Sequence, residues 1–268
     1  MKFSLTILII ALFAVSAKSQ SGRSTLAFGD GERLEFVVSY RARMWPNTDV
    51  GDVVLKVSQQ QNRFTLEGRA QTRSFFRWFY ELTETYTTVM DVSTLRPLTA
   101  SGRTREKKYQ FDGDMAFDWN EMVVQSTWRT SRRPENRHKT IPITENSVDG
   151  LSLFYRLRNT DISTLRMGVP VPLELVLSDT IRTIYYKFLG REVLNVSGLG
   201  RFRTLKFSCT LATSEGESFE DGSEFFIWIS DDRNRIPLLV ESPIRVGSVR
   251  VRLRRHSGLR HPVDSRIR

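Results

Sequence analysis

The side chains that could carry out catalysis or bind a metal are scattered along the sequence. The three histidines, His138, His256 and His261, have no ligand spacing such as His-x-x-x-His. The sequence also lacks a glycine-rich phosphate loop and the Gly-x-Ser-x-Gly turn that exposes a nucleophilic serine. We therefore predict no catalytic residue, no metal site and no cofactor.

Paired carboxylates are the catalytic arrangement that the sequence leaves open, because a glycoside hydrolase needs only two of them across a cleft. Glu81 and Glu84 lie beside an aromatic segment, but residues three apart on a strand point to opposite faces. The acidic run from Glu215 to Glu224 lacks the spacing of a calcium-binding loop, and we interpret it as a solvated hairpin loop. A carbohydrate-active hydrolase remains an alternative function.

An aromatic cluster is the strongest local signal for binding. The segment SFFRWFY, residues 74–80, places five aromatic side chains in seven positions. Two interpretations are open: a short element that closes one end of a sheet as core, or the rim of an apolar cavity where Trp and Tyr contact an amphiphile or a polymer. The predicted ligand-binding residues are Phe75, Phe76, Trp78, Phe79 and Tyr80, together with Tyr155 of a predicted helix.

Positive charge gathers at the C-terminal end. The chain carries 40 Lys and Arg against 30 Asp and Glu, and residues 245–268 contribute eight arginines and one acid. Arg250, Arg252 and Arg254 alternate with apolar residues and should share the solvent face of a last strand. There they either discourage association between sheets or bind anionic envelope lipid or polysaccharide phosphate. Residues 256–268 contain Gly, Pro, Ser and few apolar groups, and they are predicted to form a flexible basic tail.

The first residues have the pattern of a secretory signal peptide. Lys2 precedes an apolar run over residues 3–15, and small residues follow. The run is shorter than the ~20 residues that a membrane-spanning helix needs. We expect residues 1–19 to be removed by cleavage after Ala17 or Ser19. The product would be a soluble periplasmic or extracellular protein, not lipidated because no cysteine lies near the cut, and nucleic acid is then a poor partner despite the basic pI.

Period-two alternation of apolar and polar residues, typical of strands, dominates the remaining sequence, for example over residues 32–40. Asp112-Gly113-Asp114 is interpreted as a tight turn between two strands that carry aromatic residues, and residues 130–140 as a loop. The clearest helix signal spans residues 149–159, with Asp149 as its N-terminal cap.

These signals predict an all-β fold over residues 20–255: one large, strongly curved antiparallel sheet or open barrel with one short helix. A two-sheet β-sandwich is the alternative. The single cysteine, Cys209, excludes an intramolecular disulfide. It lies in an alternating segment, so we predict a buried structural thiol.

The order of the motifs resembles a known family. The series runs from Gly31-Glu32-x-Leu34-x-Phe36 through the aromatic segment, SVDGLSLFYRLRN, Gly190-Arg191-Glu192-Val193 and IWISDDRNRIPLLVES to Gly247-Ser248. Over about residues 28–254 it resembles the secreted bacterial family catalogued as domain of unknown function 3108. The resemblance implies an exported all-β protein and brings no established activity or catalytic residues. Gly150 stands where the family has the proline of an Asp-Pro-x-Ser helix start.

Taken together, export, missing catalytic motifs and excess aromatic residues indicate a non-enzymatic envelope protein. We expect it to bind an apolar or amphiphilic, lipid-like ligand in the concave face of the sheet. Besides the hydrolase, the remaining alternative is a protein–protein module of an envelope assembly. The sequence leaves the identity of the ligand and the oligomeric state open.

Overall fold

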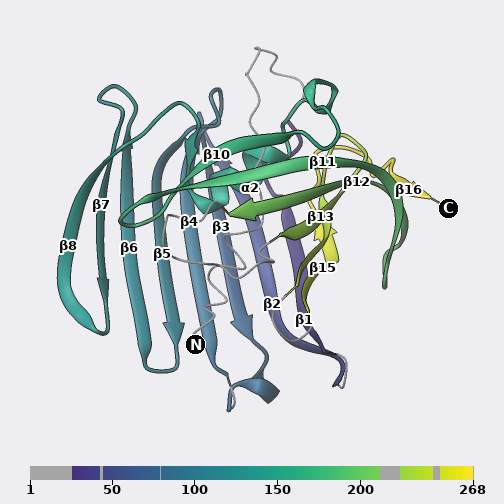
Figure 1. Cartoon of the computed structure of the whole chain (residues 1–268), viewed down its shortest axis with the longest axis horizontal. Helices are drawn as coiled ribbons and strands as arrows, with labels where there is room; N and C mark the ends of the chain where they lie inside the picture. Colours follow the sequence, from purple (N-terminus) through teal and green to yellow (C-terminus); the bar gives the residue numbers. More distant parts are fainter. Residues whose placement is uncertain (1–25, 43–44, 79, 212–223, 244–247, 268) are drawn as a thin grey trace.

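The computed structural model describes residues 26–42, 45–78, 80–211, 224–243 and 248–267, and within them it shows one 16-stranded sheet (Figure 1). The strands of the first half are β1 (Arg33–Ala42), β2 (Trp45–Gln60), β3 (Arg63–Thr72), β4 (Leu82–Asp91), β5 (Pro97–Glu106), β6 (Tyr109–Asp118), β7 (Val123–Thr130) and β8 (Arg133–Pro142). Those of the second half are β9 (Ser147–Val148), β10 (Pro170–Val176), β11 (Ile181–Val196), β12 (Gly200–Leu211), β13 (Phe225–Ser230), β14 (Pro237–Pro243), β15 (Ser248–Ser257) and β16 (Arg266–Ile267).

The first eight strands form an antiparallel meander, and along most of them buried residues alternate with more exposed ones. In β3, for example, Phe64, Leu66 and Ala70 are buried, whereas Glu67 and Arg69 between them are exposed. One face of the meander is therefore apolar and needs a cover, and the opposite face is solvated.

The second half of the chain provides that cover by continuing the same sheet. β15 pairs with β1, and β14 to β10 follow in order, so that β10, β11 and β12 cross over the meander (Figure 1). Bulges, such as the one between Phe188 and Gly190, interrupt the register and allow the strands to bend. The sheet does not close, because it ends at β8 on one side and β9 on the other. The predicted all-β fold with a strongly curved sheet is confirmed, and the sandwich alternative is wrong.

Helix α2 (Gly150–Leu157) lies inside the fold of the sheet, against β3, β4 and β10. The predicted cap is confirmed, since the Asp149 carboxylate accepts hydrogen bonds from the backbone N–H of Leu151 and Ser152. The Ser152 hydroxyl in turn bonds back to the backbone N–H of Asp149, which completes a capping box.

A buried ion pair fixes the other end of the helix. Arg158, which is 1% exposed, places its guanidinium 2.5 and 2.7 Å from the two carboxylate oxygens of Glu32. The same guanidinium donates to the backbone carbonyls of Ala27 and Asn234. These contacts tie the segment before β1, the end of α2 and the β13–β14 turn together.

Two local predictions are wrong. Asp112-Gly113-Asp114 is not a turn but lies in the middle of β6, where Gly113 pairs with Gly102 of β5 and Trp128 of β7. Residues 130–140 are not a loop, because most of them form β8, an exposed edge strand. In both places the sheet supplies hydrogen-bond partners from distant segments, which outweigh the local turn preference. The predicted burial of Cys209 is confirmed.

The flexible tail that the sequence predicts for residues 256–268 is a further error for residues 256–267. Residues 256–257 belong to β15, and Arg266–Ile267 form β16 against β12. Between them, Ser265 is fully buried and donates a 2.6 Å hydrogen bond to Asp232, and Asn234 bonds to the backbone of His261 and Pro262. Specific polar contacts therefore hold a segment that has few apolar residues to bury.

The predicted signal peptide, residues 1–19, lies outside the described residues. Among the residues that the structure does describe, no helix is long and apolar enough to cross a membrane.

Candidate functional site

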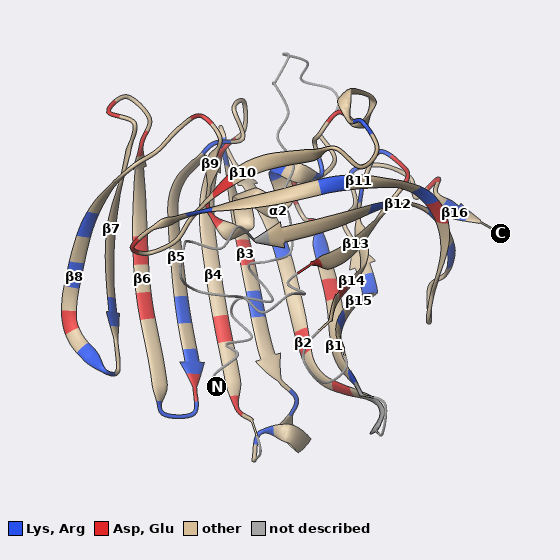
Figure 2. Cartoon of the chain, in the orientation of Figure 1, with Lys and Arg blue, Asp and Glu red and all other residues tan. Residues whose placement is uncertain are grey.

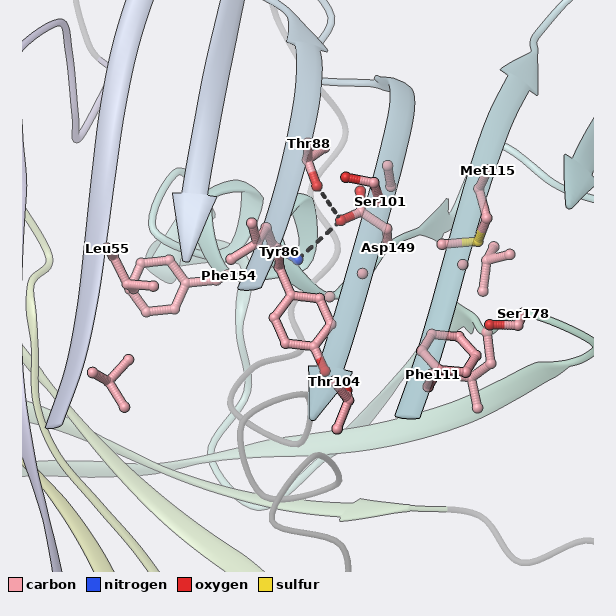
Figure 3. Close-up of a pocket in the computed structure, with 18 of the residues that line it drawn as sticks. Leu55, Tyr86, Thr88, Ser101, Thr104, Phe111, Met115, Asp149, Phe154 and Ser178 are labelled. Atoms are coloured by element: carbon pink, nitrogen blue, oxygen red, sulfur yellow. Dashed lines mark hydrogen bonds between the residues drawn. The ribbon is translucent and has the colours of Figure 1, made fainter. Parts of the chain in front are cut away.

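A cavity of about 340 Å³ lies on the concave face of the sheet (Figure 3). Its floor comes from β4, β5 and β6, and one wall from the first turn of α2 and the residues after β10. The other side is apolar, with Phe36, Val53, Leu55 and Val251 from β1, β2 and β15. The volume falls within the range of ligand pockets, roughly 300 to 1,000 Å³.

A row of glycines leaves the space for this cavity. Strand pairing places Gly68, Tyr86, Gly102 and Gly113 next to one another across β3, β4, β5 and β6. The Tyr86 ring lies over Gly102, where an added Cβ would come within 3.0 Å of it. The Phe111 ring covers Gly113 even more closely, at 2.6 Å from such a Cβ. Both rings can therefore lie along the floor instead of filling the cavity.

The polar groups of the cavity are concentrated on its β4–β6 side. Tyr86 points toward Thr104, and burial, followed by the charge of Glu84, raises the pKa of the tyrosine well above its ordinary value (Figure 3). Glu84 is itself fully buried. Tyr109, the first residue of β6, is half-buried, and burial raises the pKa of its hydroxyl as well. Because the hydroxyl oxygens of Tyr86 and Thr104 are buried, a ligand would meet the half-buried Tyr109 on this side and hydrocarbon on the β1–β2 side.

The described lining residues include one carboxylate, that of Asp149, and its oxygens already accept hydrogen bonds within the protein. Thr88 donates to it at 2.6 Å, and Ser152 and the backbone of Leu151 also donate. Burial raises the pKa of Asp149, although these hydrogen bonds act against that effect. Hydrolysis by paired carboxylates needs a second acid facing the first, and the described lining supplies none. The described residues also contain no cluster of His, Cys, Asp and Glu that could hold a metal ion.

Those predicted ligand-binding residues that the structure describes do not line the cavity. Phe75 and Trp78 are 75% and 82% exposed, on the connection between β3 and β4 that begins with the short 3₁₀ helix η1 (Ser74–Phe76). Phe76 stacks edge-on against Phe75, and Tyr80 is half-buried in the same connection. Tyr155 packs in the core against Phe28 and Phe154 instead. Phe79 and residues 215–223 of the acidic run lie outside the described residues.

The three arginines predicted to face an anionic surface are engaged within the protein. β15 is an inner strand, flanked by β1 and β14, so the expectation of a last strand at an edge is wrong. Arg250 pairs with Glu241 at 2.8 Å, and Arg254 lies 3.2 Å from Glu35. Arg252 donates to a backbone carbonyl at 2.7 Å. Carboxylates of the same protein therefore pair with Arg250 and Arg254, whereas Arg252 is held by a neutral carbonyl.

The residues that form the floor escaped the sequence analysis. Tyr86, Gly102 and Phe111 sit on three different strands and share no motif. Their one sequence signal is indirect: Ala100, Gly102 and Thr104, small or hydroxyl residues, recur at alternate positions of β5, where a closed core would require larger apolar residues.

The open curved sheet and its partly covered concave cavity define a β-barrel-like protein. The chain belongs to the family described as "Protein of unknown function (DUF3108)", whose model matches residues 35–254. In fold it is similar to the beta-barrel-like protein of domain of unknown function DUF1849 from Brucella abortus. That crystal structure aligns with a TM-score of 0.60 and 12% identity, over 86% of this chain and 98% of that chain. No curated protein matches the chain in sequence.

Proposed function

We propose that the protein is exported and binds an apolar or amphiphilic molecule in the concave cavity, without catalysing a reaction on it. The observation that carries this proposal is the cavity itself, which has apolar walls and a glycine floor that keeps it open. A space of about 340 Å³ is large enough to hold a small amphiphile. The signal-peptide pattern of residues 1–19 supports export.

The arrangement of the walls favours an amphiphile over a purely apolar ligand. Phe36, Leu55 and Phe154 offer hydrocarbon, and the half-buried Tyr109 and Ser178 offer hydroxyl groups elsewhere in the lining. A molecule with an apolar chain and one polar end, such as a fatty acid, could satisfy both sides at once.

Filling the cavity tests the proposal. Ala100 is buried and lines the cavity, so Ala100→Phe should weaken binding of a dansyl-labelled fatty acid by at least about tenfold, or 1.4 kcal/mol. Thr99→Phe is the matched control, because Thr99 is exposed on the opposite face of the same strand. Native mass spectrometry of the purified wild type should show a bound amphiphile. Equal binding by the two variants, or no uptake of the probe by the wild type, would refute the proposal.

A further inference from the structure

The connections at one end of the meander join exposed aromatic residues to basic ones. They are the described residues of the β3–β4 connection (73–78 and 80–81), the β5–β6 turn (residues 107–108) and the β7–β8 turn (residues 131–132), and we call this surface the rim. Hydrogen bonds place them side by side: Lys107 N–H donates to the Glu81 carbonyl, and Ser131 N–H donates to the Gln110 carbonyl. The three connections therefore form one continuous surface (Figure 1).

The rim has the two features by which proteins adsorb to a bilayer. Phe75 and Trp78 are the most exposed large apolar side chains among the described residues, and aromatic residues insert readily at the membrane interface. Beside them stand exposed basic residues, which anionic lipids attract. The basic residues of the rim are Arg73, Arg77, Lys107, Lys108 and Arg132, and its acid is Glu81.

Most of that positive charge is available to a partner. Arg73 is bound to Asp49 and Asp52, but no ion pair occurs for Arg77, Lys107, Lys108 or Arg132 within the described part of the chain. Figure 2 shows the β5–β6 turn as an uninterrupted basic segment. The opposite end of the meander differs, because the connections over residues 61–62, 92–96 and 119–122 carry one basic residue and one acid, Arg96 and Glu121.

We infer that the rim is a docking surface for an anionic lipid bilayer. Phe75 and Trp78 enter the interface, and Arg77, Lys107, Lys108 and Arg132 contact lipid phosphates. The hydroxyl side of the cavity lies close to this end, since Tyr109 directly follows Lys108 and lines the cavity. Docking by the rim would therefore bring the cavity near the lipids. That consequence rests on the proposed function, whereas the docking itself does not.

Flotation of the full mature chain with vesicles tests the inference. We expect binding to vesicles that contain phosphatidylglycerol, weaker binding to phosphatidylcholine vesicles, and a decrease as salt screens the charges. The Phe75→Ser/Trp78→Ser variant should bind at least about tenfold more weakly. Its control is Met167→Ser/Val169→Ser, which removes two exposed apolar side chains elsewhere. Lys107→Glu/Lys108→Glu should also bind at least about tenfold more weakly, and its control, Lys56→Glu/Arg69→Glu, reverses two exposed charges on the convex face.

The outcomes separate this inference from the proposed function. Failure of the intact protein to bind anionic vesicles, or equal losses in the rim variants and their controls, would overturn the docking surface. Uptake of the dansyl-labelled fatty acid without vesicles should be unchanged in all four variants. If the wild type docks but takes up no probe, the cavity proposal fails and the docking surface stands.

Discussion

Removing the charge of Glu32 should destabilise the fold more than any exposed substitution. In Glu32→Gln the guanidinium of Arg158 stays charged and only 1% exposed, without its counter-ion. Breaking a buried pair in this way costs about 3–5 kcal/mol. Arg158 retains its hydrogen bonds to the carbonyls of Ala27 and Asn234 and lies 5.4 Å from the centre of the Tyr155 ring. These contacts partly compensate the charge, so we expect the free energy of unfolding to fall by about 3 kcal/mol, the lower end of that range.

Substitution of the arginine should cost more than substitution of the glutamate. Arg158→Met leaves a buried carboxylate and also removes the donor for two buried carbonyls, and each unsatisfied group costs about 1–3 kcal/mol. We therefore expect about 5 kcal/mol or more. The double variant should lose less than the sum of the two single losses, because each change removes the partner that makes the other costly.

Urea denaturation and thermal melting measure these losses. For a chain of this size, 1 kcal/mol shifts the Tm by about 2–4 °C, so Glu32→Gln should lower it by about 6–12 °C. The matched control is Arg33→Met, which breaks the neighbouring pair with Glu35, where the arginine side chain is 40% exposed. That pair is worth about 1 kcal/mol or less. If Glu32→Gln unfolds within 1 kcal/mol of the wild type, or no more easily than Arg33→Met, the buried pair does not anchor the helix.

Three further results are expected. Asp149→Ala removes the helix cap and leaves the buried Thr88 hydroxyl without its acceptor, so urea denaturation should show a loss of about 2–4 kcal/mol; a loss near zero would contradict the role of the cap. Burial alone would raise the pKa of Asp112, but hydrogen bonds and charge from two arginines hold it below its ordinary value. The stability that the ionised Asp112 carboxylate contributes to the fold is therefore present above about pH 4. It is lost as the pH falls through the pKa of the folded state. Asp112→Asn should show a shallower loss of stability in acid, and an unchanged pH profile would count against this. Deletion after Arg255 removes β16 and the hydrogen bond from Ser265 to Asp232, so the free energy of unfolding should fall by at least about 2 kcal/mol. An unchanged Tm would instead support the prediction that this segment is a flexible tail.

The sequence was sufficient for those parts of the fold that depend on neighbouring residues. Alternation identified most strands, and the polar residue before an apolar helical stretch identified Asp149 as the cap. It failed where partners come from far along the chain. Gly113 has the local signature of a turn, but strands on both sides hold it in an extended ladder. Arg252 lies in an alternating segment of the kind expected on an edge strand. However, β1, far earlier in the sequence, pairs with β15 and makes it an inner strand.

The same distinction explains why the contiguous aromatic run did not mark the cavity. Adjacent residues of a strand point to opposite faces, so even on a strand a run of consecutive aromatic residues could not line one concave surface. A cavity on a sheet is lined by every second residue of several strands, and here it combines small or hydroxyl residues on β5 with aromatic ones on the flanking strands. The lining residues of these strands are Tyr86 and Thr88 on β4, Ala100, Gly102 and Thr104 among those on β5, and Tyr109, Phe111, Gly113 and Met115 on β6. Register decides which of them meet, and it becomes visible only once the strands are paired. An exposed aromatic run next to basic turns is instead the expected sequence signal of a surface that contacts a lipid bilayer, which is the role we assign to the rim.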